Sequence, residues 1–510
     1  MSKVIGFLIT GVTNQEAAFV ILEGERVKVG HYYFIKHPIY NSDVLLIVHS
    51  IQPYNPEMVV GRPGILTAQK GIKIQTGRYL ESHIAYAEMA GYFDGKGKWR
   101  QLEVAPDVGA EVYQPTEEEL DRFFRMAKKE NDCLYVEIGK VHDTNIPVYL
   151  DLNVVAKSHI LVAGMTRAGK SSFIVNLAVK STKLNPRPRL IIFDRRREYG
   201  SLTKYPGVRI VPYNRFIPLG CSPRVAAKKL GLEDRDAKIL ETALNSISAG
   251  NLSREELLGR VKEEAQSVYK RESDADRCYQ YIEKKLSKEG SFLFEHREVL
   301  DILEEVEKTP TLIIDFSTDG DIESQHLTAA NIFDKIMRHA MARRGDFAVI
   351  ICVEEAQYFA PEKGLEIAPS IAQDEVKAKF IEAISQAGGY NVGLVVMTQR
   401  PAYVAKSVIS QCNSVACFRL KSGNDQNAIL NYTEQGSEKY RDVLPGLADH
   451  EVLLWGLALH TPFPVVAELT VDEYPQKAIV SAKQAWQRMT PYRSGDAPIK
   501  KPKIEEHVAY

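Results

Sequence analysis

The stretch HILVAGMTRAGKSSFIVNLAVK, residues 159–180, decides the fold of this chain. A short apolar run leads into a glycine-bracketed loop, and an apolar-periodic segment follows, which predicts a strand, a turn and a helix. The loop from Gly164 to Ser171 fits the pattern G-x-x-x-x-G-K-[ST] without exception. Glycines let the backbone N–H groups face a phosphate, and the N-terminus of the helix adds its positive end. The stretch therefore predicts a nucleotide-phosphate loop.

The residues of this loop have distinct expected roles. Lys170 can reach the β- and γ-phosphates of ATP, and the hydroxyl of Ser171 can ligate Mg²⁺. Arg167 is open to two interpretations, a solvent-facing loop residue or a contact to a phosphate or a neighbouring subunit. The residues expected around the phosphates are Gly164, Arg167, Ala168, Gly169, Lys170, Ser171 and Ser172.

Apolar runs of four to eight residues recur after the loop and alternate with helical patterns. Such runs are typical of strands buried on both faces of a parallel sheet. We therefore expect an α/β fold with a RecA-like core. The runs are RLIIFD (189–194), TLIIDFS (311–317), FAVIICVEEA (347–356), VGLVVMTQ (392–399) and SVACFRL (414–420).

Polar side chains end three of these runs. They lie at the carboxyl ends of the strands, which is where parallel sheets bind ligands. Glu354 and Glu355 end one run, and we assign Glu354 to support of Mg²⁺ and Glu355 to the general base that polarises the attacking water. Gln399 ends another run, either as a sensor of the γ-phosphate or as a simple strand cap. Asp194 ends a third run and, with Glu198, could face the nucleotide. The arginines at 195–197 are either a solvated run or contacts to these acids or to nucleic acid.

The remaining chain divides by pattern. Short Val-, Ile- and aromatic-rich runs before residue 115 predict a small β-barrel, and Thr116 with Glu119 forms a capping box that starts a helix. Charged helical patterns follow Cys221, either as a solvated subdomain or as a docking element for a partner. The expected domains are a barrel at 1–115, a linker helix and hairpin at 116–150, a core at 151–221 and 309–470, a helical insertion at 222–308 and an arm or tail at 471–510.

Composition excludes several classes of protein. The 510 residues carry a net charge of −1, so contacts to nucleic acid must come from local clusters. The six scattered cysteines include no C-x-x-C pair, which argues against a disulfide scaffold or a zinc site and favours a reducing cytoplasm. No apolar run reaches 18 residues, so we expect no contact with a membrane.

The ordered motifs resemble the HerA family of hexameric DNA-pumping ATPases. The resemblance covers residues 4 to about 470, and it includes IGFLITGVT in the barrel and IIFDRRREYG, VEEAQYFAP and LPGLADHEVLLWG in the core. It implies a HAS-barrel-like N-terminal domain, a homo-hexameric ring around double-stranded DNA, and ATP bound between subunits. By motif position it implies roles for Lys170, Ser171, Glu355 and Gln399 as above, with Asp194 near the site.

One departure from the family bears on activity. The family commonly carries an arginine finger before the G-V-G-L strand, whereas this chain has Gly388, Gly389 and Tyr390 in SQAGGYNVGL. A finger arginine stabilises developing charge and is worth ~10³-fold or more in rate. Its replacement therefore indicates a substitute residue, weak hydrolysis or activation by a partner. The candidate substitutes are Arg400, as first choice, Arg419 and Arg167.

Two functions remain open from the sequence. The first is an ATP-driven DNA translocase or helicase that works with a nuclease or an NAD-hydrolysing effector in DNA end processing, DNA repair or antiphage (antiviral) defence. The second is an ATP-binding scaffold that organises an effector with little translocation. A small-molecule kinase would need neither the barrel nor the paired glutamates. For the translocase we expect Lys363, Lys377 and Lys379 to line the DNA channel and contact phosphates.

Overall fold

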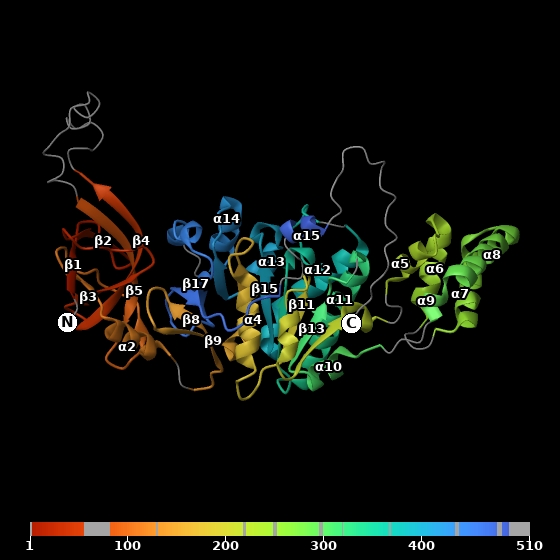
Figure 1. Cartoon of the computed structure of the whole chain (residues 1–510), viewed down its shortest axis with the longest axis horizontal. Coiled ribbons are helices and arrows are strands. Elements are labelled where there is room, and N and C mark those ends of the chain that lie inside the picture. The colour runs from red at the N-terminus through yellow and green to blue at the C-terminus, as the bar shows by residue number, and fades with distance from the viewer. Residues whose placement is uncertain are drawn as a thin grey trace, which may run out of the picture.

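The computed structural model describes residues 3–55, 82–128, 131–217, 221–247, 252–294, 299–318, 320–366, 369–433, 438–476 and 482–488. Figure 1 shows an elongated molecule with a β domain at one end, a sheet covered by helices in the middle and a helical lobe at the other end. The described part of the chain contains no helix that is long and apolar enough to cross a membrane.

The N-terminal domain is a closed antiparallel barrel, as predicted. Its strands pair in the order β2-β1-β7-β3-β4-β5, and β2 also pairs with β5, which closes the sheet. Among the described residues, closure gives each of these six strands a partner on both sides, and β6 pairs only with β5. The strands are β1 (Lys3–Leu8), β2 (Glu16–Ile21), β3 (Tyr32–His37), β4 (Ser42–Tyr54), β5 (Ser82–Phe93), β6 (Trp99–Arg100) and β7 (Glu111–Gln114).

Helix α2 (Glu117–Ala127) joins the barrel to the core. The Thr116 hydroxyl accepts from the backbone N–H of Glu119, and the Glu119 carboxylate accepts from that of Thr116, which is the predicted capping box. The buried face of α2 carries Phe123 and Phe124, whose rings contact Phe463 of the core. Barrel, helix and core therefore share one apolar cluster.

The central sheet has eleven strands in the order β12-β13-β11-β14-β15-β10-β16-β17-β18-β8-β9. The strands from β12 to β16 are parallel, and the others are antiparallel. The strands are β8 (Tyr135–Val141), β9 (Pro147–Asp151), β10 (Ile160–Ala163), β11 (Leu190–Asp194), β12 (Val208–Pro212), β13 (Thr311–Asp315), β14 (Val349–Val353), β15 (Val392–Thr398), β16 (Ser414–Phe418), β17 (Glu451–Gly456) and β18 (Val465–Leu469).

Helices cover both faces of this sheet. Alternate residues of β10 enter different clusters: Leu161 packs with α11 and α12, whereas Ile160 packs with α4. This two-sided burial explains the continuous apolar strands and confirms the predicted α/β core. The helices of the core are α3 (Leu152–Ser158), α4 (Lys170–Ser181), α10 (Ile302–Lys308), α11 (Ile322–Arg343), α12 (Ile371–Gln386), α13 (Lys406–Ile409) and α14 (Gly423–Tyr432).

The structure differs from the expected domain limits at two places. The hairpin β8–β9, which we grouped with the linker, extends the core sheet through β18 because Gly139 pairs with Leu469. Helix α10, which we grouped with the helical insertion, packs Ile302 and Val306 into the core. The helical lobe has its own apolar core, formed by α5 (Pro223–Lys229), α6 (Asp234–Ser246), α7 (Arg254–Val268), α8 (Glu272–Glu289) and α9 (Ser291–Phe294).

The expected C-terminal arm lies largely outside the described residues. Its first residues run along the core, where the backbone N–H of Asp472 donates to the side chain of Asn176 at 2.6 Å. Further along, the backbone N–H of Gln476 donates to the carbonyl of Glu198 at 2.7 Å. Helix α15 (Ala482–Arg488) is the last described element.

Candidate active site

The phosphate loop lies between β10 and α4 and is packed closely against β16. Gly169 has a φ of 124°, in the region that favours glycine, and a Cβ there would lie 2.8 Å from Cε1 of Phe418. A Cβ on Gly164 would lie 2.6 Å from Cβ of the same phenylalanine. The loop can therefore approach the sheet only because both residues lack side chains.

Lys170 is the first residue of α4, and its side chain is buried. Its ammonium group donates to the carbonyl oxygens of Gly164 at 2.8 Å and Met165 at 2.9 Å, so it lies folded inside the loop. Burial lowers the pKa of Lys170 to about 8, and the charge of Glu355 acts in the opposite direction. An anionic phosphate in the loop would offer this ammonium group a stronger acceptor than two neutral carbonyls.

The other residues of the loop differ in exposure. Ala168 and Ser172 are buried, and Ser171 is half-buried at the start of the helix. Arg167 is exposed and adopts a left-handed φ of 66°. This exposure is compatible with both interpretations of Arg167, a solvent-facing residue and a contact to another subunit.

Glu354 follows β14 and is buried. Its carboxylate accepts a hydrogen bond from the backbone N–H of Arg195 at 2.9 Å. Burial, and next the charge of Asp194, raise the pKa of Glu354 to about 8, and Glu198 and Glu355 add to the effect. Glu354 thus lies near three other carboxylates, and a cation bound there would favour its ionised form.

Asp194 caps the turn that follows β11. Its carboxylate accepts backbone N–H groups from Arg196 at 3.0 Å, Glu198 at 3.2 Å and Tyr199 at 3.3 Å. Burial raises the pKa of Asp194 to about 6, although these three hydrogen bonds oppose the rise. The side chain thus fixes the shape of the turn beside the carboxylate cluster.

Glu355 is held at its carboxylate by three other side chains. Arg196 Nη2 lies 2.5 Å from Oε1, Gln399 donates to the same oxygen, and Gln357 donates to Oε2 at 2.6 Å. The backbone of Glu355 is left-handed, with a φ of 51°. A non-glycine residue in this region is strained, and such residues cluster at functional sites.

Gln399 links this carboxylate to the phosphate loop. Its amide donates to Glu355, and its carbonyl oxygen accepts from the hydroxyl of Thr166 at 2.5 Å. Gln399 thus bridges two elements of the site, an arrangement that the sensor interpretation requires. The sequence placed Gln399 at the end of β15 but gave no indication of Thr166 as its partner.

The arginine run after β11 contacts acids, in agreement with one of its two interpretations. Arg196 pairs with Glu355, and Arg197 pairs with Asp315 at 3.3 Å. The guanidinium of Arg195 lies 3.1 Å from the ring centroid of Tyr358. Arg196 is thus a site residue that sequence reasoning did not single out, because nothing in the run Arg-Arg-Arg distinguishes its middle member.

The three arginines considered as finger substitutes are in different environments. Arg400 pairs with buried Asp425 at 3.3 Å and lies over the ring of Tyr403. Arg419 pairs with Asp449 at 2.6 Å. Both therefore have ion-pair partners within the chain, which was the alternative to a finger role, whereas Arg167 lies exposed in the loop.

The expected channel lysines differ in exposure and in ion pairing. Lys363 is exposed in the loop after β14, and Lys377 is half-buried on α12. Lys379 is bound to Asp334 at 2.9 Å and Glu382 at 3.1 Å, so its charge is balanced within the chain. Lys363 is thus the most accessible of the three.

The donor set at this edge of the sheet fits a nucleotide with Mg²⁺. Ser171 and Glu354 supply the hydroxyl and carboxylate oxygens that Mg²⁺ prefers, and Lys170 supplies a buried cation for phosphate. The sheet, the loop and the strand-end acids together define a P-loop ATPase.

Comparison with known proteins finds similarity to one family. The family described as "Helicase HerA, central domain" matches residues 136–336. The relative named "DNA double-strand break repair helicase HerA" from Sulfolobus acidocaldarius is 22% identical over 90% of this chain and 92% of that protein. The protein of the same name from Sulfurisphaera tokodaii is 23% identical, over 93% and 94%. These matches support assigning the chain to the HerA family.

A solved structure of VirB4 of Thermoanaerobacter pseudethanolicus is also similar to this chain. It shares 14% identity with a TM-score of 0.47, and the match covers 67% of this chain and 98% of that one. The fold assignment given above rests on the parallel sheet and the phosphate loop of the chain itself.

Proposed function

We propose that this chain is an ATP-dependent translocase or helicase of double-stranded DNA that assembles as a homo-hexameric ring. The observation that carries the proposal is the link from the phosphate loop through Gln399 to Glu355. Such a link lets the presence of a phosphate change the position of the carboxylate beside it. Binding of nucleotide is supported by the phosphate loop and its buried Lys170, and the ring follows from the family resemblance.

Nucleotide binding would begin at the phosphate loop. Lys170 would leave the carbonyls of Gly164 and Met165 and turn to the β- and γ-phosphates, since these are charged acceptors. Ser171 and Glu354 would hold Mg²⁺, which offsets the charge of the phosphates. Loss of the proton from Glu354 would accompany binding, because a bound cation would lower the pKa that burial and Asp194 raise.

Glu355 would accept the proton of the attacking water. Arg196 and Gln357 orient its carboxylate from two sides. Gln399 would give up its hydrogen bond to Glu355 or to Thr166 and form one with a phosphate oxygen instead. Gln399 would thereby report the state of the nucleotide. Asp194 would act indirectly by holding the turn that carries Arg196.

An arginine from the site or from a neighbouring subunit would stabilise the charge that develops during hydrolysis. Arg400 remains the first candidate. Its guanidinium would have to break its ion pair with Asp425 and contact the nucleotide instead. Gly388 has no room for a side chain, because a Cβ there would lie 2.2 Å from the carbonyl oxygen of Lys157. Gly388 is therefore part of the packing against α3, whereas a Cβ on Gly389 would meet nothing within 4 Å.

Duplex DNA would pass through the ring and contact Lys363, Lys377 and Lys379, of which exposed Lys363 would contribute most. The curated relatives carry names for repair of DNA double-strand breaks. We propose a role in DNA end processing or antiphage defence with a nuclease or NAD-hydrolysing effector as partner.

The second candidate function is an ATP-binding scaffold for an effector. The observation that favours it is the replacement of the finger arginine by Gly388, Gly389 and Tyr390. Slow hydrolysis would suit a scaffold that keeps ATP bound better than a translocase that must turn ATP over. The helical lobe projects from the core at the far end from the barrel and would serve as a docking element (Figure 1).

The test is ATP turnover by the purified assembly with and without duplex DNA, together with its native mass. The translocase predicts a hexamer whose turnover rises at least several-fold with duplex DNA. A Lys170→Ala variant, which loses the phosphate contact, controls for contaminating ATPases. Unchanged turnover with DNA, together with a stable effector complex, would instead support the scaffold.

A further inference from the structure

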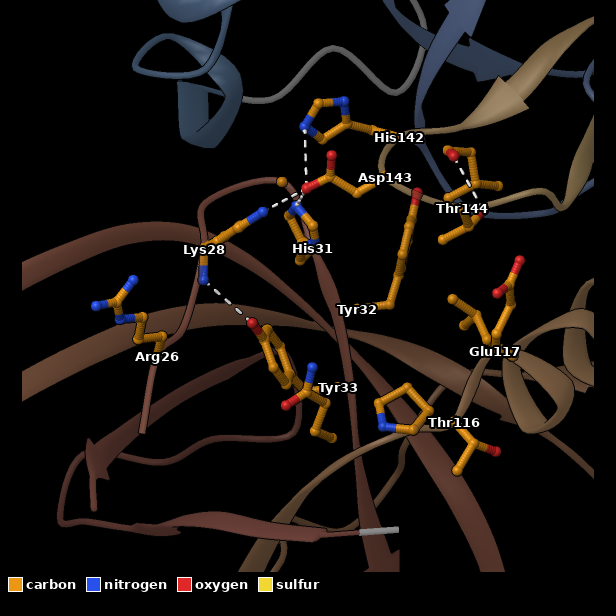
Figure 2. Close-up of a pocket in the computed structure, with 15 residues that line it drawn as sticks. Arg26, Lys28, His31, Tyr32, Tyr33, Thr116, Glu117, His142, Asp143 and Thr144 are labelled. Atoms are coloured by element: carbon orange, nitrogen blue, oxygen red, sulfur yellow. Dashed lines mark hydrogen bonds and ion pairs between the residues drawn. The ribbon is translucent and has the colours of Figure 1, made fainter. Parts of the chain in front are cut away.

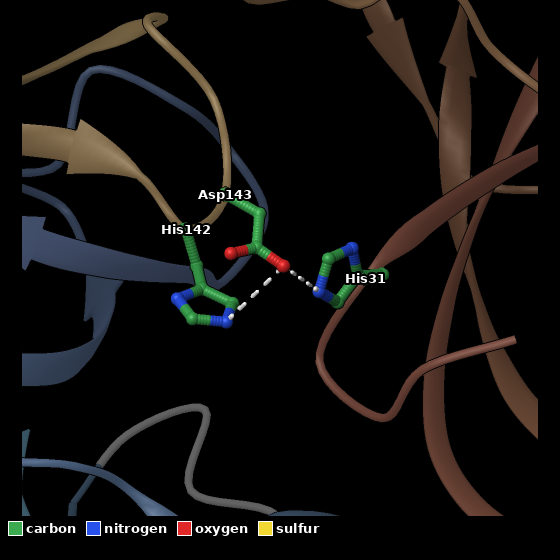
Figure 3. A group of neighbouring side chains, drawn as sticks. All are labelled: His31, His142 and Asp143. Atoms are coloured by element: carbon green, nitrogen blue, oxygen red, sulfur yellow. Dashed lines mark ion pairs between the residues drawn. The ribbon is translucent and has the colours of Figure 1, made fainter.

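A cluster of metal-ligating side chains lies between the barrel and the core, away from the phosphate loop. His31 precedes β3 of the barrel, and His142 and Asp143 form the turn between β8 and β9 of the core sheet. Figure 3 shows both imidazoles directed toward the same carboxylate oxygen. The cluster thus joins two domains at one point.

The distances in this cluster suit one small cation. Nε2 of His31 and Nε2 of His142 lie 3.6 Å and 3.7 Å from Oδ2 of Asp143. Tetrahedral Zn²⁺, with bonds of about 2.0–2.1 Å, holds its ligand atoms about 3.4 Å apart. One ligand atom from each of the three residues lies within 4.8 Å of those of the other two. Small side-chain shifts would therefore complete three bonds to one ion.

The surroundings of His142 match a second feature of metal sites. Its other nitrogen, Nδ1, lies 2.9 Å from Glu468 Oε1 and 3.1 Å from Glu451 Oε1. Histidine ligands commonly donate their second N–H to a carboxylate, which fixes the tautomer and the orientation of the ring. Neither contact is aligned as a hydrogen bond here, and a small rotation of the imidazole would align one of them.

His31 also has an unused ligand atom. Its Nε2 is buried and has no hydrogen-bond partner among the described residues. Such a nitrogen is costly to bury unless something binds it.

Lys28 is the lysine that pairs with Asp143 in this structure. Its ammonium group contacts Oδ2 of Asp143, and its side chain is 62% exposed. Figure 2 shows Lys28, His31 and Asp143 lining one side of an open pocket of about 280 Å³, with Thr116 and Glu117 on the other side. An exposed lysine can withdraw into solvent, and the pocket leaves room for a water as a fourth ligand.

We propose that His31, His142 and Asp143 form a site for a divalent transition metal, best fitted by Zn²⁺, that ties the barrel to the ATPase core. Two imidazoles and one carboxylate are donors that Zn²⁺ accepts and that Mg²⁺ does not select. Glu451 or Glu468 would accept the second N–H of His142 and so orient its ring toward the ion. This proposal is independent of the function proposed for the phosphate loop.

The test uses the full chain without a histidine tag, stripped of metal with a chelator and titrated with Co²⁺, followed by displacement with Zn²⁺. We expect one equivalent of Co²⁺ per chain to give the intense visible absorption of a tetrahedral site, and Zn²⁺ to abolish it and raise the Tm. Co²⁺ on oxygen ligands at the phosphate loop would be octahedral and absorb weakly. A chain that develops no such absorption and shows no rise in Tm with Zn²⁺ overturns the proposal without any variant.

Substitutions then locate the site. His31→Ala and His142→Ala should lose the absorption, while His83→Ala, an exposed histidine of β5, should retain it. Glu468→Gln should weaken Zn²⁺ binding by roughly 10- to 100-fold, the usual effect of an outer-shell partner. Lys28→Ala should strengthen binding, because it removes the competing cation. Circular dichroism confirms folding, and absorption that persists in folded His31→Ala and His142→Ala contradicts the proposal.

Discussion

Gln399 and Glu355 contact each other across the ends of neighbouring strands β15 and β14, and Gln399 also holds Thr166 of the phosphate loop. One amide thus connects the proposed base to the loop that would hold the nucleotide. Because the amide can donate and accept at once, it can exchange either partner for a phosphate oxygen. This relationship is the structural basis of several of the predictions below.

Gln399→Ala should lower the kcat of ATP hydrolysis by about 10- to 100-fold with a smaller change in KM. The amide acts on the base and the reacting phosphate, so its loss should act mainly in the transition state. Steady-state kinetics measure both values. Gln386→Ala, at the exposed end of α12, is the matched control and should behave as the parent. Equal kinetics for both variants would remove Gln399 from the mechanism.

Gly169→Ala should abolish ATP binding while leaving the protein folded at low temperature. Alanine is strained at a φ of 124°, and its Cβ would lie 2.8 Å from the ring of Phe418. Equilibrium binding of a fluorescent ATP analogue measures the loss. Phe418→Ala in the same chain removes the clash but not the backbone strain, so the double variant should stay defective. Recovery of binding in that variant would show that only the clash matters.

Glu354→Gln should flatten the dependence of stability on pH between 6.5 and 8 in chelated, nucleotide-free buffer. The folded protein keeps a proton on Glu354 up to about pH 8, whereas the unfolded chain releases it above 4.5. The unfolded state therefore binds fewer protons in this window, and stability falls as pH rises, by at most about 2 kcal/mol.

The measurement for this prediction is the Tm of parent and variant at several pH values. The window lies above the ordinary pKa of histidine, and Asp194, with a pKa of about 6, has largely lost its proton there. The exposed Glu118→Gln is the control and should keep the slope of the parent. Parallel curves for the parent and Glu354→Gln would contradict a protonated Glu354.

Lys363→Glu should weaken binding of duplex DNA and make it less dependent on salt, because an exposed lysine can release counterions from phosphates. Lys377→Glu should have a smaller effect. Lys379 already pairs with Asp334 and Glu382, so its reversal should act mainly on stability. Fluorescence anisotropy at several salt concentrations separates these outcomes. Unchanged affinity in the Lys363 variant would remove this loop from the channel.

The strands of the core were predictable because each is buried on both faces. The runs that end at Asp194, Glu354 and Gln399 form β11, β14 and β15 with their polar ends at one edge of the sheet. The capping box at Thr116 was also predictable, since its signal is local. These features depend on residues that are close in sequence.

Features that depend on distant residues were not predictable. The β8–β9 hairpin joins the core sheet only through its pairing with β18, which lies more than 300 residues later. Strand β12 carries only a short apolar pattern, and α10 resembles the helices of the neighbouring lobe in sequence. Arg196 has neighbours of the same type on both sides, so only the fold shows which arginine contacts Glu355.

The central claim is that Glu355 activates water for ATP hydrolysis at this site. The most direct test is single-turnover hydrolysis by Glu355→Gln, with the nucleotide on the protein identified at the same time. Glutamine preserves the hydrogen-bonding shape but cannot accept the proton, so hydrolysis should fall by roughly 100-fold or more while ATP stays bound. Hydrolysis at the rate of the parent, with ADP on the protein, would contradict the account.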